Sequence, residues 1–305
     1  MFYNFKTVLY LFIILCITYV IYVLFINYYF VKDGHIHYDI YLKNFIQVVS
    51  KDNFFMNYGY WDTADTLLQA NTDLIHLILT KSGILEKKNM HILDVGCGYG
   101  EQDFNWISLL DLTNTITAVD ISDTQIAFAK EKCKTLGLES RLFFDECDAM
   151  LLNRKFGKNT FNTILSVESA FHYSDRPRFF QSVYDILEDN GTFVICDIIL
   201  HDQYKSGPLN SLFLRIFSDF LQIPSCNLIK LKEWETTITN SGLEIVECTD
   251  ITDKTFNPYY KNFFYKYMEY YKMPSCIASS IYNFFTYVQP FSYIIAVCKK
   301  SVIIN

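Results

Sequence analysis

Acidic side chains and glycines with the spacing of a ligand-binding turn lie in the first third of the sequence. Residues 91–100 read His-Ile-Leu-Asp-Val-Gly-Cys-Gly-Tyr-Gly, so a short apolar run carries Asp94 and glycines follow at every second position. Glycine accepts the positive φ angles of a tight turn, and its missing Cβ lets a ligand approach the backbone. The pattern predicts a buried strand that leads into a turn lying against a ligand.

Two further carboxylates follow apolar runs later in the chain. Residues 115–120 read as a second strand that ends in Asp120. In dinucleotide-type folds, an acid in this place accepts hydrogen bonds from ribose hydroxyls. A third strand at residues 141–144 leads to Asp148, and a carboxylate there is suited to bind the exocyclic amine of adenine. The three acids in this order predict one composite binding site.

Alternating strands and helices must hold these residues in place. The sequence predicts strands at residues 91–95, 115–120, 141–144, 161–168, 192–197, 243–248 and 291–298, and helices at residues 62–79, 122–136, 175–187 and 234–240. This alternation indicates an α/β fold with a largely parallel sheet. Ligands bind beyond the carboxyl ends of the strands in such sheets, which is where the acids fall.

The glycine turn resembles the first motif of a known enzyme family. Residues 93–100, Leu-Asp-Val-Gly-Cys-Gly-Tyr-Gly, closely match the class I S-adenosylmethionine-dependent methyltransferases, and the Gly-x-Gly-x-Gly form differs from the Gly-x-Gly-x-x-Gly of nicotinamide enzymes. The resemblance extends over about residues 54–300. It implies a Rossmann-like, seven-stranded, mainly parallel sheet of strand order 3-2-1-4-5-7-6, with an antiparallel last strand.

The resemblance also implies which residues bind the cofactor. Asp94 and the turn at residues 96–98 would hold the methionine part, Asp120 the ribose, and Asp148 with Met150 the adenine. An aromatic element at residues 57–61 would form a lid over the methionine end, although it also reads as a simple packing cluster. The full predicted set is Tyr60, Asp94, Gly96, Cys97, Gly98, Asp120, Ile121, Asp148, Ala149, Met150 and Glu168.

A histidine and an aspartate are the predicted catalytic residues. His172 follows the fourth predicted strand, and its ordinary pKa near 6.5 suits a general base for a hydroxyl acceptor. Residues Glu168, Ser169 and His172 resemble the Glu-Ser-x-x-His element of sugar and macrolide O-methyltransferases, in which an aspartate like Asp197 orients the imidazole. The alternative for His172 is a structural histidine bonded to a backbone carbonyl. We recognise no metal-binding cluster.

Several functions are compatible with these motifs. Methyl transfer to oxygen is favoured by His172, while carbon transfer as in sterol enzymes and nitrogen transfer as in phosphoethanolamine enzymes stay open. A carbon acceptor calls for an acidic, aromatic-rich pocket. Cyclopropane synthases belong to the same superfamily. A binding protein that kept the cofactor fold without catalysis is the rival from another class.

The N-terminal residues predict a membrane anchor. Residues 7–31 contain no charged side chain, and this length is sufficient to cross a hydrocarbon core of about 30 Å as a helix. A buried helix or a re-entrant hairpin is the alternative. Lysines after the segment and an odd number of cysteines, nine, favour a single-pass protein with a cytoplasmic catalytic domain. The predicted division is an anchor at residues 7–31, a juxtamembrane and lid segment at residues 32–60, and a methyltransferase domain at residues 61–305.

Charge and aromatic content narrow the class of substrate. The net charge is −7 and no basic run occurs, which disfavours nucleic acid as a partner. Residues 201–232 carry an apolar face, and residues 253–290 are rich in Tyr and Phe. Both stretches read either as ordinary helix packing or as a cap over an apolar pocket. We therefore expect a small, lipophilic acceptor, and the sequence predicts no particular oligomeric state.

Overall fold

The computed structural model describes residues 31–32, 35–36, 54–262 and 289–300. The chain divides into two compact units, residues 1–51 and 52–305. In the first unit, β1 (Val31–Lys32) pairs antiparallel with β2 (His35–Ile36). The predicted anchor at residues 7–31 lies outside the described residues, Val31 excepted. Within the described ranges, no helix combines the length and apolar character needed to span a bilayer.

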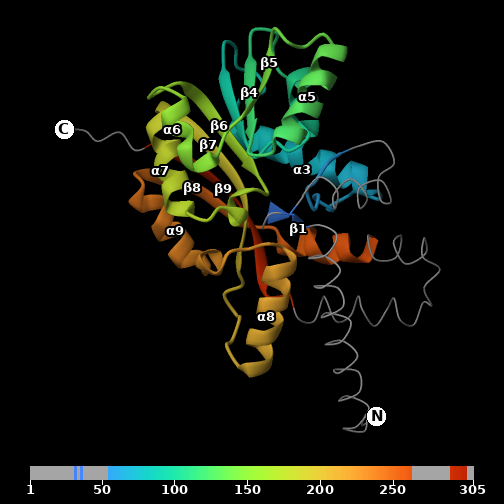
Figure 1. Ribbon diagram of the computed structural model, residues 1–305, viewed down its shortest axis with the longest axis vertical. Helices are drawn as coiled ribbons and strands as arrows, with labels where there is room; N and C mark the ends of the chain where they lie inside the picture. Colours follow the sequence, from blue (N-terminus) through green and yellow to red (C-terminus); the bar gives the residue numbers. More distant parts are fainter. Residues whose placement is uncertain (1–30, 33–34, 37–53, 263–288, 301–305) are drawn as a thin grey trace. The chain divides into compact units, whose positions relative to one another are not determined.

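The second unit is built on one seven-stranded sheet. Its strand order is β5-β4-β3-β6-β7-β9-β8, which confirms the order expected from the resemblance (Figure 1). Neighbouring strands are parallel except for β9, which runs antiparallel to both β7 and β8. The strands are β3 (His91–Val95), β4 (Thr115–Asp120), β5 (Leu142–Glu146), β6 (Phe161–Val167), β7 (Leu187–Leu200), β8 (Leu243–Asp250) and β9 (Phe291–Lys300).

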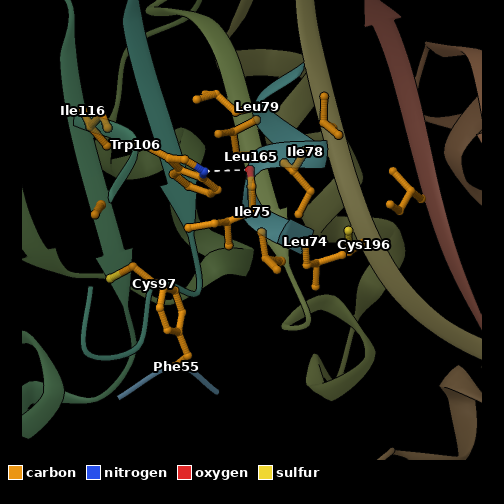
Figure 2. Packing of buried hydrophobic residues seen from close by; sticks show 14 of the residues in the cluster. Phe55, Leu74, Ile75, Ile78, Leu79, Cys97, Trp106, Ile116, Leu165 and Cys196 are labelled. Atoms are coloured by element: carbon orange, nitrogen blue, oxygen red, sulfur yellow. Dashed lines mark hydrogen bonds between the residues drawn. The ribbon is translucent and has the colours of Figure 1, made fainter. Parts of the chain in front are cut away.

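Helices cover both faces of the sheet. One face packs against α3 (Leu67–Ser82), α4 (Glu101–Leu109) and α5 (Asp123–Thr135), and the other against α6 (Leu152–Lys155), α7 (Arg176–Ile186) and α9 (Leu231–Asn240). On the first face, the fully buried Trp106 donates a hydrogen bond from Nε1 to the carbonyl of Ile75, 2.9 Å away (Figure 2). The remaining helical elements are η1 (Ala149–Leu151), η2 (Ala170–His172), α8 (Pro208–Phe220), η3 (Ser225–Asn227) and η4 (Thr252–Lys254).

Polar side chains fix where the helices around the site begin. Thr66, Ser122 and Asp175 are the N-caps of α3, α5 and α7, and each side-chain oxygen accepts a backbone N–H of the first turn. Such caps stabilise a helix by about 0.5–2 kcal/mol. The Ser122 cap starts α5 directly after β4, so the segment that follows Asp120 is short and rigid.

The structure corrects two predicted boundaries. The predicted strand at residues 192–197 is longer, because β7 extends from Leu187 to Leu200. The predicted helix at residues 175–187 ends slightly earlier, because α7 ends at Ile186; Gly191 lies within β7, and Asn190 before it is left-handed, with a φ of 63°. Of the predicted cap segments, residues 201–232 contain α8, whereas residues 263–288 lie outside the described residues.

Candidate active site

The turn after β3 has a shape that only glycine allows. Gly96, Gly98 and Gly100 have φ angles of +82°, +57° and +77°. The backbone amides of Gly96 and Cys97 donate to the carbonyl of Val119 at 2.8 and 3.1 Å, which ties the turn to β4. These contacts hold the turn as a fixed cradle at the carboxyl edge of the sheet.

The acid at the end of β4 completes this cradle. Asp120 Oδ2 accepts the backbone N–H of Gly98 at 2.9 Å, and Oδ1 accepts that of Ser122 at 3.0 Å. The next residue, Ile121, is 70% exposed. An apolar side chain that is exposed to solvent beside a polar turn can pack against the face of a planar ring.

The third acid caps a short helix beyond β5. Asp148 Oδ1 accepts the backbone N–H of Met150 at 2.9 Å, and Ala149 between them is buried. Because β3, β4 and β5 are parallel neighbours, their carboxyl ends meet at one edge. The structure thus brings six of the predicted residues to the carboxyl edge of the sheet: Asp94, Gly96, Gly98, Asp120, Ile121 and Asp148.

Asp94 lies inside the domain next to an acid that the sequence analysis missed. Both Asp94 and Asp103 are fully buried, and Gln102 Nε2 donates to Asp94 Oδ2 at 2.6 Å. Burial raises the pKa of Asp94 to about 7. Burial and the charge of Asp94 raise the pKa of Asp103 well above its usual value. The sequence signal that could have drawn attention to Asp103 is its place in the first turn of the helix that follows the glycine motif.

The aromatic element at residues 57–61 is attached to the domain by its backbone. Tyr58 N–H donates to Glu168 Oε1 at 2.6 Å, and Tyr60 N–H donates to the carbonyl of Ala70 at 2.8 Å. The Tyr60 hydroxyl accepts from Lys254 Nζ at 3.0 Å, and this ammonium lies 5.3 Å from the Tyr60 ring centroid. Tyr58 therefore contacts the acid at the end of β6.

Glu168 occupies a strained position among aromatic rings. Its φ is +52°, and besides the Tyr58 N–H its Oε1 accepts the Tyr293 hydroxyl at 2.7 Å. Burial raises the pKa of Glu168 to about 8. The Tyr58 ring lies 5.0 Å from Phe256 and 4.7 Å from Tyr259, centroid to centroid. Tyr293, the hydroxyl donor, was not predicted, because no local pattern links β9 to the end of β6.

His172 is held in one tautomer by the loop after α8. Its Nδ1 lies 3.2 Å from the carbonyl oxygen of Gln222. A carbonyl oxygen only accepts, so this contact assigns the proton to Nδ1 and leaves the lone pair on Nε2. Burial lowers the pKa of His172 to about 4. The imidazole is therefore neutral at pH 7.

Asp197 does not form the expected hydrogen bond to His172. Its Oδ2 accepts Arg176 Nη1 and Trp234 Nε1, both at 2.7 Å, and its Oδ1 accepts the N–H of Ile198 at 2.9 Å. The carboxylate points to the α7 and α9 face, because β7 continues past Asp197 and alternate residues face opposite sides of a strand. The predicted pairing is corrected: Asp197 is part of a fully buried ion pair.

Comparison with known proteins identifies the family. A family model described as a methyltransferase domain matches residues 86–238, half of the chain. The erythromycin 3''-O-methyltransferase of Saccharopolyspora erythraea is 31% identical over 209 residues, which cover 67% of each protein. The chain belongs to the class I S-adenosylmethionine-dependent methyltransferases. The cofactor of this methyltransferase is therefore S-adenosylmethionine.

Other similar proteins act on different kinds of acceptor. A sterol 24-C-methyltransferase of Aspergillus fumigatus is 26% identical over 179 residues, covering 59% of this methyltransferase and 46% of the sterol enzyme. The solved structure of the cyclopropane synthase MmaA2 from Mycobacterium tuberculosis superposes with a TM-score of 0.69 at 15% identity, over 84% of this chain and 94% of that one. The structural likeness shows the fold alone.

Proposed function

We propose that the carboxyl edge of β3, β4 and β5 holds S-adenosylmethionine through the predicted residues. The fit rests on Asp94, whose buried Oδ1 has no hydrogen-bond partner among the described residues, and on Ile121, whose exposed side chain directly follows Asp120. Asp94 with residues 96–98 would hold the methionine part, Asp120 the ribose, and Ile121 with residues 148–150 the adenine. Tyr60 and Glu168 would close the methionine end.

We propose further that this methyltransferase methylates an oxygen of a small, lipophilic acceptor. The observation that carries this assignment is the tautomer of His172, because a neutral imidazole with its lone pair on Nε2 can accept a hydroxyl proton. The cofactor supplies an electrophilic methyl group on a sulfonium. The protein's tasks are to orient the hydroxyl, exclude water and remove the proton. The similarity to an O-methyltransferase of a macrolide supports the assignment.

His172→Ala tests the base, since the hydrogen bond to Gln222 would also suit a structural histidine. General bases contribute about 10²–10⁴-fold to rate. We expect turnover of lipophilic alcohols to fall by about that factor, while the Kd for S-adenosylmethionine, measured by calorimetry, changes less than about threefold. His76→Ala, on an exposed position of α3, is the matched control. Full activity of His172→Ala overturns the assignment, as does transfer to nitrogen acceptors alone.

One observation favours carbon as a second candidate acceptor. The Glu168 carboxyl accepts the backbone N–H of Tyr58 and the hydroxyl of Tyr293, and the rings of both tyrosines pack on Phe256. Aromatic faces stabilise a cationic centre such as forms on an alkylated double bond, and Glu168 in its ionised form would add to this stabilisation. Under this alternative, Glu168→Gln abolishes methylation of an isoprenoid alkene and His172→Ala spares it. The opposite result with an alcohol supports the oxygen proposal.

We propose that residues 7–31 anchor the chain in a membrane by a single span, with residues 32–60 as the connection and the catalytic domain in the cytoplasm. The uncharged length of the segment supports this proposal. We expect the full chain to resist carbonate extraction from membranes and a chain starting at residue 32 to be released. Extraction of the full chain by carbonate contradicts the anchor. Digestion of the catalytic domain by an impermeant protease added on the extracytoplasmic side of sealed membranes contradicts the orientation.

A further inference from the structure

Two buried carboxyl groups beside the glycine turn lack the donors that buried carboxylates require. Asp94 on β3 and Asp103 on α4 are each 0% exposed. Asp94 Oδ1 and both oxygens of Asp103 accept no hydrogen bond from any described residue. Neither carboxyl belongs to an ion pair in the described part of the chain. The single side-chain donor to the pair is Gln102.

Among the described residues, no positively charged side chain forms an ion pair with Asp94 or Asp103. Asp120 at the end of β4 adds a further negative charge, and the buried Cys97 thiol in the turn has a raised pKa and stays protonated. Glu101 on α4 is neutralised by Lys132 of α5, 2.5 Å away. From α3, the side packed on α4 presents apolar residues such as Ile75.

Elementary electrostatics then requires a proton on the pair. Two adjacent buried carboxylates without a cation do not both ionise, because desolvation and mutual repulsion disfavour the second charge. A proton on Asp103 would supply the donor that the pair lacks. Burial accordingly raises the pKa of both groups, that of Asp94 to about 7. In the cofactor-free enzyme at neutral pH, the pair thus shares one proton.

We propose that binding of S-adenosylmethionine expels this shared proton from the Asp94–Asp103 pair, and that the product S-adenosylhomocysteine expels much less. The inference rests on the cofactor site proposed above. The sulfonium and ammonium groups outweigh the carboxylate of S-adenosylmethionine, so the cofactor brings a net charge of about +1, whereas the product brings about zero. A positive charge within about 6 Å lowers a carboxyl pKa by about 1–3. The proton leaves Asp103 for solvent.

This coupling gives Asp103 a defined role as a positioning residue. Asp103 acts through Asp94. The pair carries more negative charge when the positively charged S-adenosylmethionine is bound, and less when the neutral product is bound. When the methyl group leaves, the positive charge disappears and the doubly ionised pair becomes unfavourable. The pair then takes up its proton again, which weakens the hold on the product and favours its release.

Calorimetry of ligand binding in buffers of different ionisation enthalpy measures the proton directly. At pH 6.5 the α-amino group of the cofactor stays protonated, since its ordinary pKa is about 7.7–8.0. We expect the wild-type enzyme to release roughly 0.5–1 proton per S-adenosylmethionine bound and less than half of that per S-adenosylhomocysteine. The Kd for S-adenosylmethionine should fall up to about tenfold between pH 6 and pH 7, a range in which the α-amino group of the cofactor stays mostly protonated.

The variant Asp103→Asn keeps the shape and removes the proton site. Its amide donates permanently to Asp94, so we expect proton release near zero and a Kd that is flat between pH 6 and pH 7. Glu131→Gln, an exposed acid on α5 away from the pair, is the matched control, and its proton count should equal that of the wild type. Glu168→Gln tests the other acid with a raised pKa as an alternative source of the proton.

The possible failures are distinct. Tight binding by the wild type without proton release overturns the coupling and leaves the cofactor site intact. The coupling is also overturned if Glu168→Gln no longer releases a proton on binding S-adenosylmethionine while Asp103→Asn still does. Absence of binding by folded wild-type protein overturns the proposed site together with the coupling. The wild-type measurement needs no variant, so the proposal can fail even if Asp103→Asn does not fold.

Discussion

Replacing Gly96 with alanine should destabilise the domain more than the same change at Gly83 or Gly137, two left-handed glycines with free space around them. A Cβ on Gly96 would lie 2.3 Å from Ser169 Cβ and 2.5 Å from its Oγ. Ser169 has little freedom to move, because its Oγ donates to the Val95 carbonyl at 2.9 Å and accepts from Tyr173 at 3.0 Å. The left-handed backbone costs about 1–2 kcal/mol and overpacking adds about 1–3 kcal/mol. We expect a total loss of about 2–5 kcal/mol.

Two other glycines separate the free-energy cost of the close contact from that of the left-handed backbone. Gly83 and Gly137 have φ angles of +68° and +66°, and a Cβ on either would meet no atom within 4 Å. Their alanine variants should therefore lose only about 1–2 kcal/mol. Urea unfolding followed by circular dichroism gives the three free energies of unfolding. If Gly96→Ala lies within about 0.5 kcal/mol of Gly83→Ala, the close contact with Ser169 does not constrain the turn.

Further changes test the buried ion pair and the acid at the end of β6. Arg176→Met leaves Asp197 charged and unpaired, so the free energy of unfolding should drop by about 3–5 kcal/mol; a loss below 1 kcal/mol would contradict a buried pair. Trp234→Phe removes one donor to Asp197 and should cost about 1.5–3 kcal/mol, measured in the same way, and a neutral effect would show that the bond is dispensable. The pKa of Glu168 is raised to about 8 from an ordinary 4.5, so the folded protein binds more protons than the unfolded chain, and stability from this group is lost as pH rises through 8. Glu168→Gln should flatten the decline in stability between pH 5 and pH 8, and an unchanged slope would refute the shift.

Local patterns predicted the parts of the site that depend on local chain geometry. The glycines at 96 and 98 adopt the positive φ angles that their spacing suggests, and the acids at 94, 120 and 148 lie in or just after the strands that were expected to carry them. These features depend on a few residues that are neighbours in the chain, so a short stretch of sequence is sufficient to predict them. The strand order followed from the resemblance, because no short-range signal orders strands within a sheet.

Contacts between distant residues were beyond the reach of the same reasoning. The Asp197 prediction failed because hydrophobicity did not show that β7 extends to Leu200, and the face to which Asp197 points depends on packing against Arg176 and Trp234. The hydrogen bond from Tyr293 to Glu168 joins residues 125 positions apart. Asp103 looks in sequence like an ordinary acid in the first turn of a helix, and only the packing of α4 buries it.

The position of β9 has a consequence for how the enzyme is made. β7 and β8 leave the ribosome before β9, yet they are not neighbours in the sheet, since β9 inserts between them. Until Phe291–Lys300 is available, β7 therefore lacks one partner, β8 lacks its only neighbour within the described sheet, and Glu168 lacks its phenol donor. Long-range pairing of this kind is intrinsically slow. A nascent chain that carries β7 but not yet β9 thus exposes an apolar strand edge, and the hydrogen bond from Tyr293 to Glu168 forms only after β9 has inserted.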